Sequence, residues 1–210
     1  MEYFQVKKII LHLCADTGSD SYPYQKDPDY EVILVGSKIG VENYHPPKNV
    51  HGIIANPPCL EFSTARLGGK ARNSDDGMLL VKECQRIIKE ANPVWWVIEN
   101  PARGTLRNYL GKPKAIYQPY QYGSPWTKST ALWGNFNMPP KIYKSYDLPM
   151  VNPGLWIKPG RTKPSLAHQH KSAIFKIEEF APFIDSVDSD MEFRSLCSQY
   201  FANGFKEYNP

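Results

Sequence analysis

The sequence predicts an α/β domain with a largely parallel, mixed sheet and helices on both faces. Short apolar runs rich in β-branched residues alternate with a segment of helical periodicity, which is the pattern of strands joined by helices. Three of the apolar runs end in loops that carry Gly, Pro, Asp or Asn, which are turn-forming residues. With 210 residues, 41% of them hydrophobic, the chain is long enough to bury one ordinary core.

Each expected element has a local reason in the sequence. Asp75 and Asp76 stand at the acidic start of the one long amphipathic helix, and Pro93 ends it. Residues 137–165 are rich in Pro, Gly, Tyr and Lys and show no clear period. The expected strands are residues 7–14, 31–35, 52–56, 94–99, 115–120 and 130–136. The expected helices are residues 78–91, 103–110 and 191–207.

Composition and cysteine spacing exclude several classes of protein. The 22% of charged residues and 41% of hydrophobic residues argue against a disordered chain and against a coiled coil. No run reaches the roughly 18 apolar residues of a membrane span, and the first five residues do not begin a signal peptide. We therefore expect a cytoplasmic protein without a membrane partner. The four cysteines fit no zinc spacing and no disulfide framework, so we expect no metal.

The net charge of +4 is unevenly distributed along the chain. Residues 1–134 carry 16 basic and 13 acidic side chains, residues 135–180 carry 7 and 3, and residues 181–210 carry 2 and 5. This predicts three parts, which are an α/β core, a small basic segment, and a C-terminal helix that returns to the core. The basic segment favours a polyanionic partner, although a solvated surface also explains it.

Three loops that follow expected strands carry the residues that are candidates for catalysis or ligand binding. These loops, at residues 15–21, 56–63 and 99–103, are expected to meet, because ligands sit at the carboxyl ends of the strands in an open α/β sheet. Pro57 and Pro58 stiffen the second loop and present Cys59, whereas an isolated cysteine is more often a packed apolar residue. Glu99 ends an apolar strand, where burial raises a carboxyl pKa. A structural role at the strand end is the alternative.

These motifs together resemble the DNA cytosine-C5 methyltransferase family. The resemblance rests on Pro-Pro-Cys at residues 57–59 with Phe-Ser at 62–63, and on Glu-Asn-Pro at 99–101. The segment Cys-Ala-Asp-Thr-Gly-Ser at 14–19 is similar to the family's cofactor loop, and residues 122–130 are similar to its Tyr-Gly-x-Pro segment. The compact members carried by phages and prophages look most similar, which implies a bacterial or phage-infected cell.

The resemblance implies a Rossmann-like methyltransferase fold and methyl transfer from S-adenosylmethionine to C5 of a flipped cytosine in DNA. Cys59 would attack C6 of the base, Glu99 would hold N3 and the exocyclic amine, and Lys128 would hold the base carbonyl or a phosphate. The cofactor residues that it implies are Cys14, Ala15, Asp16, Thr17, Gly18, Ser19, Asn56 and Pro57. The DNA-binding residues that we expect are Ser63, Arg66, Lys158, Arg161 and Lys163.

Several positions depart from the family pattern. Asp16 stands where the cofactor loop usually has glycine, and His12 stands where a carboxylate is common in the compact members. The second strand ends in Val-Gly-Ser at 35–37 without an acid for the ribose hydroxyls, and Glu42 is the nearest candidate. Trp and Thr at positions 126 and 130 replace a Gln and an Arg.

Two other functions remain open from the sequence. The first is an amino-methyltransferase acting on adenine N6 or cytosine N4, because Asn-Pro-Pro at residues 56–58 is part of the signature of those enzymes. Cys59 then stands where they have a stacking aromatic residue, and Glu99 has no purpose. The second is a relative that binds DNA through residues 135–180 and has lost cofactor binding and activity.

Overall fold

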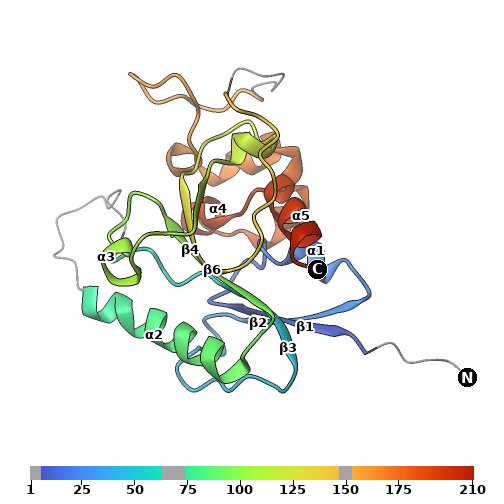
Figure 1. Cartoon of the computed structure of the whole chain (residues 1–210). Helices are drawn as coiled ribbons and strands as arrows, with labels where there is room; N and C mark the ends of the chain where they lie inside the picture. The colour runs from blue at the N-terminus through green and yellow to red at the C-terminus, as the bar shows by residue number, and fades with distance from the viewer. Residues whose placement is uncertain (1–5, 63–73, 147–152) are drawn as a thin grey trace, which may run out of the picture.

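The computed structural model describes residues 6–62, 74–146 and 153–210 (Figure 1). Ser63 and Arg66, expected to contact DNA, lie outside the described residues. A sheet of six strands runs through the molecule in the order β2-β1-β3-β4-β6-β5. The strands are β1 (Lys8–Leu13), β2 (Tyr30–Val35), β3 (Val50–Ala55), β4 (Trp95–Pro101), β5 (Ala115–Tyr117) and β6 (Thr130–Asn135).

The first four strands run parallel, and the last two form an antiparallel edge. β1 pairs with β2 on one side and with β3 on the other, and β4 continues the parallel set. β6 is antiparallel to both β4 and β5. The strand order therefore reverses at β1, because β2 follows on one side of it and β3 on the other. Rossmann-like sheets bind ligands at such a switch point. The predicted Rossmann-like, largely parallel mixed sheet is confirmed.

Helices cover both faces of the sheet, as expected. On one face α2 (Ser74–Ala91) buries Val81, Cys84 and Ile87 against β1, β3 and β4. On the other face α1 (Tyr22–Gln25) and α5 (Gln199–Tyr208) pack against the same strands (Figure 1). Phe201 and Phe205 of α5 lie in this second core cluster together with Ile54 and Val97 of the sheet.

The structure departs from the expected elements at two places that bear on the site. β4 continues through Asn100 and Pro101 instead of ending at Glu99, because β6 still pairs there after β3 has ended at the level of Ile98. Proline is tolerated in a strand where one side lacks a partner. The expected helix 191–207 is split into α4 (Asp190–Ser195) and α5, and the break at residues 196–198 lies beside Lys128.

The remaining described chain between β6 and α4 holds short 3-10 turns and no strand. These are η2 (Leu166–His168), η3 (Lys171–Lys176) and η4 (Glu178–Ser186). Earlier in the chain lie the short α-helix α3 (Arg107–Leu110) and the 3-10 turn η1 (Pro119–Tyr122). Trp126, Phe180 and Phe193 form the centre of a third apolar cluster that supports this part. The division of the chain at residues 134 and 180 stays a prediction. Across the described ranges, no helix is both long and apolar enough to span a membrane.

Candidate active site

The two motifs that are about forty residues apart in sequence are joined by a hydrogen bond. β3 and β4 are neighbouring parallel strands with Ala55 opposite Ile98, so their carboxyl ends lie side by side. Beyond them, Asn100 Nδ2 donates to the Pro57 carbonyl over 2.9 Å. Asn100 is fully buried, which makes this bond a fixed link between the Pro-Pro-Cys loop and the Glu-Asn-Pro strand end.

Cys59 shares an electrostatic environment with Glu99 and Lys128. Burial raises the pKa of the Cys59 thiol, the Glu99 carboxylate raises it further, and the Lys128 ammonium lowers it. All three side chains are half-buried, so each keeps some access to a ligand. Glu99 and Lys128 are therefore close enough to Cys59 to shift the pKa of its thiol, and Lys128 is the group that favours the thiolate.

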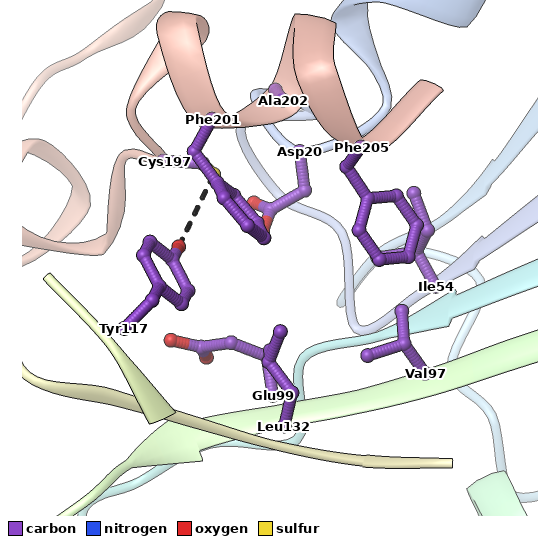
Figure 2. Close-up of a pocket in the computed structure, with 10 residues that line it drawn as sticks. All are labelled: Asp20, Ile54, Val97, Glu99, Tyr117, Leu132, Cys197, Phe201, Ala202 and Phe205. Carbon is purple, nitrogen blue, oxygen red and sulfur yellow. Dashed lines mark hydrogen bonds between the residues drawn. The ribbon is translucent and has the colours of Figure 1, made fainter. Parts of the chain in front are cut away.

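Glu99 lies on the face of β4 that looks toward α5. Its carboxyl group lines a small cavity together with Asp20, Tyr117 and Cys197 (Figure 2). Burial raises its pKa from 4.5 to about 7, the Lys128 ammonium opposes this rise, and the Asp20 carboxylate adds to it. Near neutral pH a large share of the Glu99 carboxyl groups is therefore protonated and able to donate a hydrogen bond.

The cavity beside Glu99 is narrow. It has room for about one water molecule, and Phe201 and Phe205 of α5 form part of its wall (Figure 2). A pyrimidine ring is larger than this space. Binding a base against Glu99 therefore requires the surrounding side chains to move apart.

Lys128 is held by the break between α4 and α5. Its ammonium Nζ donates to the carbonyls of Ser195 over 2.9 Å and of Leu196 over 3.2 Å. These two bonds fix the position of the charge and leave one of the three N–H donors of the ammonium for another acceptor. The helix break that the sequence pattern did not predict thus supplies the carbonyls that place Lys128.

The expected cofactor loop follows β1 and is mostly turned inward. Ala15, Gly18 and Ser19 are buried, Cys14 and Thr17 are half-buried, and Asp16 is exposed. Cys14 adopts a positive φ of 55°, which is strained for a residue with a side chain. Its sulfur lies 3.9 Å from that of Cys84. Of this loop, Asp16 offers the most accessible side chain to a ligand.

Ser19 secures the end of the loop to the start of α5. Its hydroxyl oxygen accepts from the backbone N–H of Cys197 over 3.0 Å. Its carbonyl accepts from Gln199 Nε2 over 2.9 Å. Ser19 therefore holds the loop in place and does not present its polar groups to solvent.

A buried polar network beneath the loop was not expected from the sequence. His12 Nε2 lies 2.9 Å from Asn56 Oδ1, and His12 Nδ1 lies 2.8 Å from Ser21 Oγ. Asn56 Nδ2 donates to Asp20 Oδ1 over 3.1 Å. Burial lowers the pKa of His12, so the ring is neutral, and it donates from Nε2 to the Asn56 oxygen. His12 thus links Asn56, just after β3, to Ser21 at the start of α1.

The predicted DNA-binding residues in the basic segment differ in their surroundings. Lys158 and Arg161 are exposed, and both lower the pKa of the nearby His168, which burial lowers first. Trp156, at 53% exposure, packs edge-on against the same histidine. Lys163 instead places its ammonium over the rings of Tyr120 and Tyr146, at 5.3 and 5.4 Å from their centres. Lys158 and Arg161 therefore present the freer positive charges.

Trp126, which departs from the family pattern, has a structural place. It is fully buried, and its ring N–H donates to the Glu179 carboxylate over 2.9 Å. The other oxygen of Glu179 accepts from the Gln199 N–H at the start of α5 over 2.8 Å. Trp126 therefore helps to hold α5 over the sheet. Within the described chain, no group of three His, Cys, Asp or Glu side chains is arranged to hold a metal ion.

Comparison with known proteins gives little further information. No family model matches the sequence, and no curated protein matches it. Among solved structures, the chain is similar to a candidate DNA modification methyltransferase encoded within a prophage of E. coli, with a TM-score of 0.42 and 15% sequence identity. The likeness covers 61% of this chain and 47% of that one, so this chain spans about half the length of that structure. A likeness at this level says nothing about activity.

Proposed function

We propose that this protein is a DNA cytosine-5 methyltransferase that transfers a methyl group from S-adenosylmethionine through a covalent adduct on Cys59. The observation that carries the proposal is the Asn100–Pro57 hydrogen bond, which joins the cysteine loop to the glutamate strand end. The pKa of the Cys59 thiol responds to Glu99 and to Lys128, and the pKa of the Glu99 carboxyl group, which is partly protonated at neutral pH, responds to Lys128. Cytosine-5 chemistry needs these three groups together.

Cys59 supplies the nucleophile. Its thiolate adds to C6 of the cytosine, which forms a C–S bond and moves the ring electron pair toward C5 and N3. Burial disfavours the thiolate at neutral pH, and the Lys128 ammonium partly offsets this cost. A thiol is strongly nucleophilic even when only a small fraction of it is ionised.

Glu99 supplies the acid. In its protonated form it donates to N3 while the thiolate adds, so that the negative charge does not accumulate on the ring. The electron pair at C5 would then form the bond to the methyl group that S-adenosylmethionine supplies, while the methyl–sulfur bond breaks and S-adenosylhomocysteine leaves with that bonding pair. The C5 proton passes to solvent, Cys59 leaves as the C5–C6 double bond re-forms, and Glu99 recovers its proton from N3. Every proton and electron pair in the cycle is thereby accounted for.

The loop after β1 fits a nucleoside cofactor. S-adenosylmethionine, when bound, supplies an electrophilic methyl group on a sulfonium ion. The residues on this side are the loop Cys14–Ser19, whose Asp16 is exposed at the switch point of the sheet, and Asn56 and Pro57 from the neighbouring β3 end. The side chain of Asn56 is hydrogen-bonded to His12 and Asp20, so its backbone is the part that remains for the cofactor.

DNA would be held by exposed positive charges outside the sheet. C5 and C6 of a stacked cytosine are out of reach of a side chain, so the base must leave the helix at a cost of a few kcal/mol. Lys158 and Arg161 offer phosphate contacts, which position a duplex without reading its sequence.

The product of the reaction tests this proposal. The protein is incubated with duplex DNA and S-adenosylmethionine that carries a labelled methyl group, and the DNA is digested to nucleosides for mass spectrometry. We expect the label on 5-methylcytosine. Label on N4-methylcytosine or N6-methyladenine would support the amino-methyltransferase instead. The absence of any label, together with a failure to bind the cofactor, would support the inactive DNA-binding relative.

A further inference from the structure

Two positions that depart from the family pattern, Asp16 and the end of β2 at Gly36, lie next to each other in the structure. β2 ends without an acid, at Val35 followed by Gly36, although a carboxylate at this level is the usual acceptor for ribose hydroxyls in Rossmann-like sites. Asp16 stands in the loop after β1. Because β1 and β2 are parallel neighbours with Leu13 opposite Val35, the segments that follow them begin side by side.

The Asp16 carboxylate occupies the space of the missing side chain at residue 36. A Cβ atom on Gly36 would lie 2.8 Å from Asp16 Oδ1 and 2.9 Å from the Ala15 carbonyl oxygen. Both distances are shorter than contacts that a real Cβ atom makes, so a side chain at residue 36 would collide with the Ala15 backbone and would displace the Asp16 carboxylate. Asp16 Oδ1 also accepts from the Ser37 N–H over 2.8 Å, which anchors the carboxylate there.

We infer that Asp16 delivers, from the loop after β1, the carboxylate that binds the ribose hydroxyls of the nucleoside cofactor. This inference rests on the proposed function. One carboxylate oxygen accepts from Ser37, next to the end of β2, and the residue is exposed, so the carboxylate is open to a ligand at this level. The carboxylate thus comes from the loop after β1 instead of the end of β2, and Gly36, which has no side chain, leaves room for it.

Glu42, the acid that follows β2 at a greater distance, is differently placed. A Cβ atom on Gly40 would lie 2.8 Å from Glu42 Oε2, so the Glu42 side chain is folded back over Gly40 in the turn after β2. It makes no contact with residues 36 or 37 that resembles the Asp16 contact in the described chain. Glu42 therefore serves as a matched control that carries the same charge in the same region.

The test measures the dependence of binding on the ribose hydroxyls. S-adenosylhomocysteine and its analogue without the 2′- and 3′-hydroxyls are titrated into the wild type, D16N and E42Q by calorimetry. D16N retains an oxygen acceptor for Ser37 and removes the charge. Since hydrogen bonds to charged groups contribute about 1.5–3 kcal/mol, we expect the wild type to bind the analogue roughly 10- to 150-fold more weakly.

D16N should bind S-adenosylhomocysteine more weakly by a similar factor and should then no longer distinguish the two compounds. E42Q should behave as the wild type does. G36A provides a second variant, because its methyl group collides with both Asp16 Oδ1 and the Ala15 carbonyl oxygen without any change of charge, and it should weaken binding in the same way. Thermal melts of each variant establish that it is folded.

The outcomes separate this inference from the proposed function. If the wild type binds S-adenosylhomocysteine but D16N still discriminates the analogue as strongly, or if E42Q removes the discrimination instead, Asp16 does not hold the ribose. The proposed function then stands without it. If the wild type binds neither compound, both the inference and the cofactor part of the proposed function are wrong.

Discussion

The loops after β3 and β4 differ from the loops after β1 and β2 in how closely they follow a sequence pattern. Cys59 and Glu99 occupy positions that match the methyltransferase motifs, and a hydrogen bond from Asn100 joins their segments. On the other side, Asp16 and Gly36 both depart from the pattern, yet the structure places the carboxylate of one in the space left by the other. Under the proposed function, bond-making chemistry requires a particular atom from a particular position, whereas a hydrogen-bond acceptor can be supplied from either of two adjacent strand ends.

The largest expected effect comes from removing the nucleophile on the β3 side. We expect C59S to lower the rate of 5-methylcytosine formation by at least about 10³-fold, because a hydroxyl at this site is essentially never ionised. S-adenosylhomocysteine binding, measured by calorimetry, should change less than twofold. A variant that keeps more than a tenth of the wild-type rate would show that the transfer does not proceed through this sulfur.

A smaller effect is expected from loosening the link between the two motifs. N100A removes the bond to the Pro57 carbonyl, so the cysteine loop loses its fixed position, and we expect the rate to fall about 10- to 100-fold. The free energy of unfolding should fall by about 1–3 kcal/mol. T105A is the control, since its hydroxyl makes only a long 3.4 Å contact with the Phe62 carbonyl in the same loop. Equal losses in the two variants would argue against a specific role for Asn100.

Glu99 makes a prediction about stability as a function of pH. Its pKa is raised from 4.5 to about 7 in the folded protein, so the folded state binds a proton more tightly than the unfolded state does. The free energy of unfolding should therefore fall as the pH rises from about 4.5 to 7. E99Q cannot ionise, so it should be more stable than the wild type above pH 7 by on the order of 2–3 kcal/mol, with the difference vanishing near pH 4.

Denaturant titrations of the wild type and E99Q at pH 4.5, 6 and 7.5 measure this difference. E178Q is a suitable control, because Glu178 is exposed and its replacement should leave the pH dependence of stability unchanged. A difference between E99Q and the wild type that stays constant over this range would show that Glu99 is not held in an environment that raises its pKa. Glu99 could then not serve as the proposed proton donor to N3 at neutral pH.

The smallest expected effects lie outside both pairs of loops. K158A and R161A should each weaken DNA binding several-fold and reduce the salt dependence of log K by about one phosphate contact. K163A should change it less, because its ammonium already lies over Tyr120 and Tyr146. Fluorescence anisotropy at several salt concentrations measures all three slopes. A larger change in K163A than in K158A would show that the aromatic contact does not occupy this lysine.

Local sequence signals were sufficient for the sheet but not for the contacts between its ends. The apolar runs and the prolines predicted every strand to within a few residues, and the mixed, largely parallel sheet followed from them. The extension of β4 through Pro101 depends on the pairing of β6, a partner distant in sequence. Similarly, the break at residues 196–198 places carbonyls next to Lys128, and no periodicity within the helix predicts this break.

The same limit applies to the candidate site. Cys59 and Glu99 were predicted because stiff loops and apolar strands precede them, and their catalytic roles stay a prediction. Asp20 was missed, although it lies in the polar cluster after β1, because only the fold brings it beside Glu99 and Asn56. The placement of Asp16 beside Gly36 could not be predicted either, since it depends on the 2.8 Å hydrogen bond from the Ser37 N–H to Asp16 Oδ1, between residues that are 21 positions apart.

The identity of the sulfur that attacks the base is the central claim, and trapping the adduct tests it most directly. DNA that contains 5-fluorocytosine blocks the last step, because fluorine at C5 cannot leave as a proton. After incubation with S-adenosylmethionine and proteolysis, mass spectrometry locates the modified residue. We predict a modification on Cys59 that requires the cofactor and is absent from C59S. A modification on Cys197, the buried thiol on the other wall of the Glu99 cavity, would contradict the account, as would a protein that methylates cytosine but forms no adduct.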